Sequence, residues 1–279
     1  MSPENKTRWF PAKALGPLLF LIALGIRVLG IGWGLPNQMR WNSLHPDEPI
    51  VWAYAQQLEP AKLDFDPGFY NYGTLYLTVV NVATRMVDAY GGGPNGQTDE
   101  AAFQAIGRYH LAGRWASSLA GAGLVWVVFA LGRKRFGPIG ATFGAAVVAF
   151  APGLVVHSRF QTVDMLATLL LALGVFWGLR GLTDESEPHP RWAVYSGLFF
   201  GLSAGTKYTG VLGLVLVAAV CWFRPPGLRL RPMLAAAVTM VVAFFVATPG
   251  ALLHPEAFWR DFRYEMAHTS TGHGLVFAA

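Results

Sequence analysis

The stretch "WAVYSGLFFGLSAGTKYTGVLGLVLVAAVCWF" (Trp192–Phe223) decides the fold of this chain, because it is apolar throughout and yet has a lysine, Lys207, near its centre. One helix over about 32 residues would be roughly 48 Å long, at about 1.5 Å per residue. The hydrocarbon core of a membrane is only about 30 Å thick. We therefore predict a break near Gly205 and two short membrane-spanning helices in place of one.

The composition of the whole chain is that of a membrane protein. The sequence is 53% hydrophobic and only 13% charged, with a mean hydropathy of +0.39, whereas soluble domains carry about 25% charged residues. The net charge of +5 does not indicate nucleic-acid binding, because the Lys and Arg residues lie in short clusters between apolar runs. The single cysteine, Cys221, excludes an internal disulfide framework and a cysteine-based zinc site.

The apolar segments predict an all-α, polytopic membrane protein with about seven transmembrane helices, counting the broken segment as two. The segments are Ala14–Leu35, Ala112–Leu131, Pro138–Val155, Val163–Leu179, Trp192–Phe223 and Met233–Leu253. The first has the basic flank of a signal peptide, but no small-residue cleavage site follows it and the apolar run continues. We expect it to be an uncleaved span.

The basic clusters test the predicted break independently of helix length. With two spans, all three clusters fall on the N-terminal side of the membrane, as the positive-inside rule requires of the cytoplasmic side. With one span, the last cluster would move to the opposite side. The clusters are Arg133 to Arg135, Arg180 with Arg191, and Arg224 with Arg229 and Arg231.

This topology makes residues 1–279 a single transmembrane domain in the cell membrane. Its first extracytoplasmic loop covers about residues 36–111, and a later one begins in residues 254–279. The first loop holds half of the sixteen acidic residues, namely Asp47, Glu48, Glu59, Asp64, Asp66, Asp88, Asp99 and Glu100. A polar site on this side of the membrane is therefore expected.

An apolar segment within the first loop begins at Gly73. A membrane crossing here would move every later basic cluster to the other side, so we predict a helix in the membrane interface. Tyr70, Tyr72 and Tyr76 suit that depth.

The stretch "HPDEPIVWAYAQQL" (residues 45–58) holds the first candidate site. Pro49 suits the first turn of a helix, with Asp47 or Glu48 as its cap. Ile50, Tyr54 and Leu58 recur at helical spacing, which predicts an amphipathic helix on the membrane surface. A carboxylate at such a helix N-terminus is held ionised and is a candidate general base, although spacing alone equally fits a capping pair.

Two further groups carry charge at the expected outer surface. In "HSRFQTVDML", Asp164 begins the next span, and it is either a site residue, a cap or the partner of Arg159. In "GTKYTG", Lys207 occupies a recess between two short helices, where it would attract phosphate unless it extends to the lipid headgroups.

Three other groups of candidate residues each allow more than one interpretation. Arg27, deep in the first span, and Arg114, at the start of the second, could each pair with an acid or contact an anionic ligand. Glu265 and His268 have an i, i+3 spacing usable for a divalent metal, with no third ligand defined. The "DFD" of residues 64–66 is a weak signal for a metal–sugar nucleotide.

The pieces "HPDE", "FYNYGTLYL", "GRWASSLAGAG", "HSRFQTVDMLATLLL" and "GLSAGTKYTGVLGL", in this order, resemble the C-type-fold membrane glycosyltransferases. Within this fold, the chain is similar to the protein O-mannosyltransferases and to the aminoarabinose transferase of lipid A. The resemblance implies transfer of a sugar, with inversion, from a polyprenyl-phosphate donor to an acceptor on the extracytoplasmic side. Members of this family run well beyond 279 residues, so the chain is expected to be an N-terminal portion.

By the same resemblance Asp47 is the catalytic carboxylate, supported by Glu48, and Lys207 with Arg159 binds the carrier phosphate. Asp164, Arg114 and Tyr72 complete the expected substrate-binding set, and metal dependence stays open. The chemistry of the reaction agrees with these roles. Attack of an acceptor hydroxyl on the anomeric carbon, with phosphate as the leaving group, needs one base near the hydroxyl and one cation at the phosphate. It does not need the two flanking carboxylates of glycoside hydrolysis.

The competing interpretation is a transporter or flippase of a lipid-linked anion, which would also use a broken helix and a buried lysine. The long acidic loop argues against it, because transporters keep their sites between spans. A purely structural membrane subunit would leave the clustering of acids unexplained. The expected partners are the donor lipid, an unidentified acceptor and membrane lipid, with no nucleic acid.

Overall fold

The computed structural model describes residues 14–93, 98–182 and 190–271 of the chain. These residues are helical, with no strand beyond two isolated β-bridges. The α-helices are α1 Leu15–Val28, α2 Asp47–Ala55, α3 Leu75–Ala89, α4 Asp99–Phe150, α5 Pro152–Ser158, α6 Asp164–Gly178, α7 Arg191–Ala204, α8 Gly213–Trp222, α9 Leu230–Ala247, α10 Gly250–Leu253 and α11 Pro255–Thr271. Short 3-10 helices are η1 Pro60–Lys62, η2 Leu179–Leu182, η3 Tyr208–Leu212 and η4 Pro226–Leu228.

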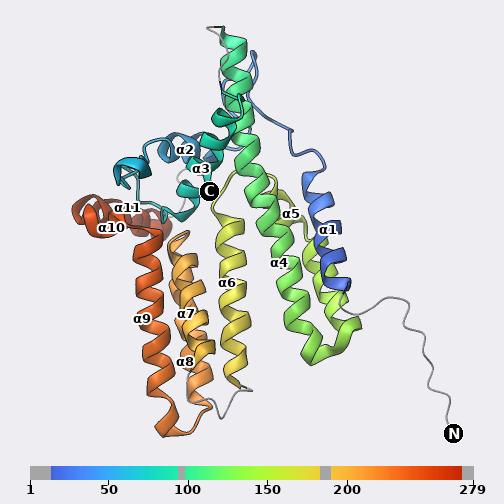
Figure 1. Cartoon of the computed structure of the whole chain (residues 1–279), viewed down its shortest axis with the longest axis vertical. Coiled ribbons are helices and arrows are strands. Elements are labelled where there is room, and N and C mark those ends of the chain that lie inside the picture. The colour runs from blue at the N-terminus through green and yellow to red at the C-terminus, as the bar shows by residue number, and fades with distance from the viewer. Residues whose placement is uncertain (1–13, 94–97, 183–189, 272–279) are drawn as a thin grey trace, which may run out of the picture.

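The helices run between two chemically different ends of the molecule (Figure 1). Helices α6 to α9 lie side by side, and α1 lies against α4. At one end, here called the polar end, α2, α3, α10 and α11 gather across the helix tips. Every described Asp and Glu belongs to an element at this end. The predicted collection of acids at one end of the fold is therefore present.

Three helices of the described chain are long and apolar enough to cross a membrane, namely Asp99–Phe150, Asp164–Leu182 and Pro226–Ala247. Leu15–Val28 and Tyr208–Trp222 are apolar but shorter. The helix Asp99–Phe150 is divided at Gly137, whose backbone has a φ of 69°. One arm of the helix ends there, and the next arm begins at Pro138. Its two arms match the second and third predicted spans, and the all-α, polytopic fold class is confirmed.

The predicted break in Trp192–Phe223 is present. Helix α7 ends at Ala204, Lys207 is extended with φ −146° and ψ 126°, and η3 and α8 follow. The carbonyl of Gly205, which the break releases from helical bonding, accepts the backbone N–H of Leu75 at 3.0 Å. Thr248 of the α9–α10 turn donates to the same carbonyl at 3.4 Å. The polar end is thus fastened to the break by hydrogen bonds that satisfy its backbone.

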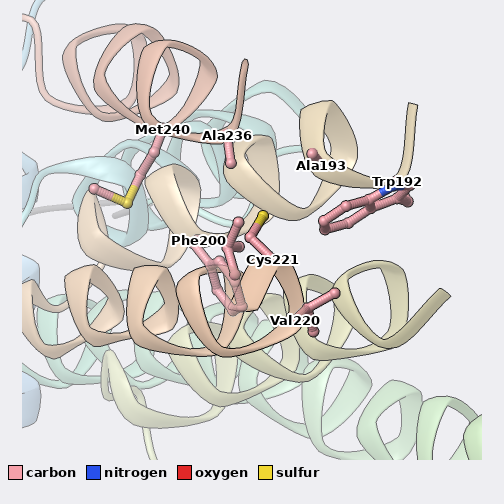
Figure 2. Packing of buried hydrophobic residues seen from close by; sticks show 8 residues of the cluster. Trp192, Ala193, Phe200, Val220, Cys221, Ala236 and Met240 are labelled. Atoms are coloured by element: carbon pink, nitrogen blue, oxygen red, sulfur yellow. The ribbon is translucent and has the colours of Figure 1, made fainter. Parts of the chain in front are cut away.

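Helix α7 packs closely on α9 through a line of glycines at a spacing of four residues, Gly197, Gly201 and Gly205. A methyl group on Gly201 would meet the carbonyl oxygen of Met240 at 2.3 Å. Such small-residue lines let membrane helices approach each other without a hydrophobic driving force. Figure 2 shows the buried cluster beside this contact, with Phe200 of α7 near Cys221 of α8.

We expect Gly201→Ala to lower the free energy of unfolding by about 1–3 kcal/mol, because the added methyl group overpacks the α7–α9 contact. The measurement is thermal unfolding of the purified protein in detergent. Gly144→Ala is the matched control, since open space surrounds that position and alanine favours a helix. Equal stability of the two variants would contradict the packing described here.

Helix α2 differs from its prediction in cap and in buried face. Its N-cap is Pro46, and no side chain caps it, so neither Asp47 nor Glu48 serves that purpose. The buried positions are Glu48, Val51 and Ala55, whereas Ile50 is 44% exposed. The face of α2 that packs against α3 and α4 is therefore the face of these three buried residues. The predicted apolar face with Ile50 does not make this contact.

The segment after Gly73 forms the predicted helix, α3, but its tyrosines do not lie at a free surface. Tyr70 and Tyr76 are fully buried, and the Tyr76 hydroxyl bonds to the Gly113 carbonyl at 3.1 Å and to Ser117 Oγ at 2.7 Å. The prediction of interfacial tyrosines is wrong for these two, because Tyr76 packs α3 on α4, while Tyr70, before α3, packs against Ala251 of α10 and Phe258 of α11.

Candidate active site

Glu48 is the most completely bonded side chain at the polar end. Arg114 of α4 donates from Nε to Oε1 at 2.8 Å and from Nη2 to Oε2 at 2.6 Å. The backbone N–H of Gln161 donates to Oε1 at 2.7 Å, and the Ser43 hydroxyl donates to Oε2. Both carboxylate oxygens therefore have two donors each inside the protein, and neither faces an open site.

Arg114 extends this network to the segment after α1. Its Nη1 donates to the carbonyls of Ile31 at 2.6 Å and Trp33 at 2.7 Å. One buried ion pair thus joins the α1–α2 connection, α2, α4 and the α5–α6 connection. Two-pronged bonding between a guanidinium and a carboxylate is the geometry for which arginine is preferred over lysine.

The Glu48 carboxyl is ionised in this setting. Burial alone would raise its pKa, but the hydrogen bond and charge of Arg114, with the bonds from Ser43 and Gln161, hold the pKa of Glu48 below its ordinary value. A carboxylate whose oxygens are all occupied is a poor acceptor for a substrate proton. Glu48 accordingly fixes the start of α2, where Asp47 is its neighbour.

Asp47 is the first residue of α2 and, unlike Glu48, is partly exposed. It lies close enough to Tyr72 to contribute, after burial and together with Glu265 and Asp164, to raising the pKa of Tyr72 to about 12. Carboxylates from α2, α6 and α11 therefore all contribute negative charge at one phenol. The Tyr72 hydroxyl stays protonated at neutral pH and is available as a hydrogen-bond donor.

Lys207 lies at the broken helix beside this group. Its ammonium contacts Asp164 Oδ1 at 2.8 Å, and His157 Nδ1 lies 3.9 Å from Asp164 Oδ2. Lys207 is 41% exposed at its side chain. Because an ammonium has three donors and Asp164 takes one, Lys207 retains donors for an anion.

Helix α11 holds the loop that carries Tyr72. Asp261 accepts the backbone N–H of Tyr70 at 3.0 Å, and Glu265 accepts the side-chain amide of Asn71 at 3.0 Å. From the broken helix, the Tyr208 hydroxyl donates to the Tyr70 carbonyl at 2.6 Å. The residues expected to begin a later external loop therefore form a helix that helps to build the site.

The candidate residues divide into three sets. Asp47, Tyr72, Asp164 and Lys207 come together, Glu48 and Arg114 lie buried beneath them, and Arg159 contacts the Ile26 carbonyl at 2.9 Å. The partner of Asp164 is Lys207, and the alternative pairing with Arg159 is not made.

The proposed metal pair is not gathered into a larger cluster. Glu265 faces Asn71, while the His268 ring stacks on Tyr264 with centroids 5.9 Å apart. In the parts of the chain that the structure describes, no group of three or more His, Cys, Asp or Glu is arranged to hold a metal ion. Asp64 and Asp66 of the "DFD" accept backbone N–H groups within their own turn.

Sequence reasoning missed Ser43, Gln161 and the role of Glu265 as a third carboxylate. Ser43 stands in the same short stretch as Glu48, so its proximity was a usable signal. Gln161 acts through its backbone N–H, for which side-chain chemistry gives no signal.

The sequence model of one family, described as dolichyl-phosphate-mannose-protein mannosyltransferase, matches residues 100–252, more than half of the chain. The chain belongs to this family. The match includes Arg114, Asp164 and Lys207, while Asp47 and Tyr72 precede it. No curated protein and no solved structure shows a significant match to the chain. Membership and the apolar helices together identify a membrane protein of a mannosyltransferase-type glycosyltransferase family.

We expect Glu48→Gln to cost about 3–5 kcal/mol of stability, because it leaves the Arg114 charge buried without a partner. Unfolding by denaturant in detergent measures this cost. Asp47→Asn is the control and should remain within about 0.5 kcal/mol of wild type, since that side chain makes no ion pair in the described chain. A similar loss in both variants would contradict the division of roles between the two acids.

The lowered pKa of Glu48 gives this contribution a pH dependence. A carboxyl whose pKa falls on folding stabilises the protein fully above its ordinary value of about 4.3. The contribution is lost as the pH falls through the folded-state pKa. Wild type should therefore lose more stability between pH 5 and strongly acidic pH than Glu48→Gln, measured as unfolding midpoints across that range. Parallel pH profiles would refute an ionised Glu48.

Proposed function

We propose that this protein transfers a sugar from a polyprenyl-phosphate donor to an acceptor hydroxyl, with inversion at the anomeric carbon. The observation that carries the proposal is that Tyr72 feels the charge of two carboxylates at the polar end, the partly exposed Asp47 and Asp164, and that Asp164 holds the accessible cation Lys207 in an ion pair. Family membership supplies the class of reaction, and the family description names a lipid-linked donor.

Asp47 acts as the general base. It accepts the proton of the acceptor hydroxyl while the hydroxyl oxygen attacks the anomeric carbon. The bond from that carbon to the phosphate oxygen breaks, and polyprenyl phosphate leaves with the bonding electrons. Attack from the face opposite the leaving group inverts the configuration. A positioned base of this kind contributes about 10²–10⁴-fold to the rate.

Lys207 binds the departing phosphate. Its ion pair with Asp164 holds the ammonium at the broken helix, and the remaining donors face the charge that develops on the phosphate oxygen. Phosphate leaves without protonation by a general acid, which agrees with a carboxylate, Glu48, that is committed to Arg114.

The polar end is proposed to face the extracytoplasmic side. Every described acid lies at this end, and the basic clusters of residues 133–135, 180, 191, 224, 229 and 231 belong to the opposite helix ends. Basic residues favour the cytoplasmic side of a membrane. A donor flipped to the outer leaflet would then meet Asp47 and Lys207 directly.

We expect Asp47→Asn to reduce kcat by at least about 100-fold, because the amide cannot accept the hydroxyl proton. The assay measures sugar release from polyprenyl-phosphate mannose by purified protein, supplemented by further polyprenyl-phosphate sugars. Binding of the carrier lipid should persist in this variant. Asp99→Asn is the control, since Asp99 is an exposed acid at the N-terminus of α4.

Lys207→Ala provides a second, separable expectation. It should weaken carrier binding and slow turnover, because it removes the cation at the phosphate. If Asp47→Asn keeps full turnover, the general-base assignment fails. If the protein instead moves the intact donor between leaflets of a vesicle, with no sugar released, the transporter interpretation replaces this one.

A further inference from the structure

Arg27 and Arg159 form a pair of neighbouring cations near the polar ends of α1 and α5. Arg27 is fully buried, and every acceptor that it contacts is neutral. Its Nε bonds to Ser158 Oγ at 3.0 Å, and its Nη atoms bond to the carbonyls of Ala23 at 3.1 Å, Ala149 at 3.3 Å and Val148 at 3.4 Å.

Arg159 has still fewer partners. Its Nη2 donates to the Ile26 carbonyl at 2.9 Å, while its Nε is buried without a hydrogen-bond partner. Its charge also acts on Arg27, so the two guanidinium groups lie close enough to repel each other. A buried N–H without an acceptor costs about 1–3 kcal/mol, and more on a charged group.

No acid of the described residues compensates this charge. Neither Arg27 nor Arg159 forms an ion pair there, and the third arginine in the region, Arg114, is neutralised by Glu48. Two cations at the edge of a membrane-spanning region are expensive without a counter-charge. These two cations therefore favour binding of an anion that the described residues do not supply.

A cavity of about 410 Å³ lies beside Arg159. It is lined by Gly30, Trp33, Arg114, Val156, Arg159 and Phe160. The two lining side chains Trp33 and Val156 are 63% and 49% exposed. The cavity thus combines a cationic interior with an apolar rim beside α1 and α5, which suits a charged headgroup attached to hydrocarbon chains.

We propose that this cavity binds the phosphate group of a lipid, with Arg159 as its principal ligand, at a site separate from Lys207. The separation rests on different partners, since Lys207 pairs with Asp164 of α6 and Arg159 contacts the end of α1. The site lies close to the reaction centre through a chain of contacts. Phe160 of the cavity lies against the ring of His45, with centroids 4.7 Å apart, and the Asp47 N–H bonds to His45 Nδ1 at 3.3 Å.

Native mass spectrometry of the full chain in detergent tests this site without any need for enzymatic activity. The probes are phosphatidylglycerol, polyprenyl phosphate and an uncharged, phosphate-free galactolipid. Arg159→Gln should weaken binding of at least one phosphate lipid by about 10-fold or more, the effect of losing one charge-assisted hydrogen bond. Binding of the galactolipid should not change.

Two variants complete the comparison. Arg191→Gln removes one exposed cation at the start of α7, at the opposite end of the helices, and should bind all three probes as wild type does. Val156→Trp fills the cavity while keeping every charge, so it should weaken phosphate-lipid binding as Arg159→Gln does. If Arg159→Gln fails to fold, Val156→Trp still tests the proposal.

The two phosphate lipids distinguish the source of the ligand. Selective loss of phosphatidylglycerol identifies a bulk anionic phospholipid, and selective loss of polyprenyl phosphate identifies the carrier. Unchanged affinities in both cavity variants would overturn the proposal, as would an equal loss of the galactolipid. Neither result bears on Asp47, so the proposed sugar transfer and this site stand or fall separately.

Discussion

The buried ion pair between Glu48 and Arg114 is the interaction on which the polar end depends. It joins the segment after α1, the start of α2, the first half of α4 and the α5–α6 connection. Because a buried charge without its partner is very unfavourable, the four segments are held in one arrangement. Asp47, the residue before Glu48, is thereby held near Tyr72 although it makes no ion pair of its own in the described chain.

A second constraint comes from the interrupted helix. Ending α7 at Ala204 releases the Gly205 carbonyl, which accepts the backbone N–H of Leu75, the first residue of α3. The same interruption exposes Lys207 next to Asp164. The feature that shortens two helices therefore also supplies the cation of the proposed site and anchors the loop that carries Tyr72.

Much of the fold could be predicted from the sequence, but only where a physical rule allowed a single structure. Helix length and the side preference of basic residues both required the break near Gly205. Spacing could not choose between Arg27 and Arg114 as the partner of an acid, because pairing depends on how whole helices pack. It also favoured the wrong face of α2, since burial of Glu48 against Arg114 outweighs the apolar pattern of Ile50. The backbone N–H of Gln161 has no sequence signature.

The measurement that tests this account most directly is the turnover of the double variant Glu48→Gln/Arg114→Gln against each single variant. If the pair only positions Asp47, removing both charges leaves two amides that bond to each other, and the double variant recovers activity that each single variant loses. We predict that recovery, together with restored stability. A folded double variant as inactive as Asp47→Asn would contradict the account, because it would assign Glu48 or Arg114 a part in the chemistry itself.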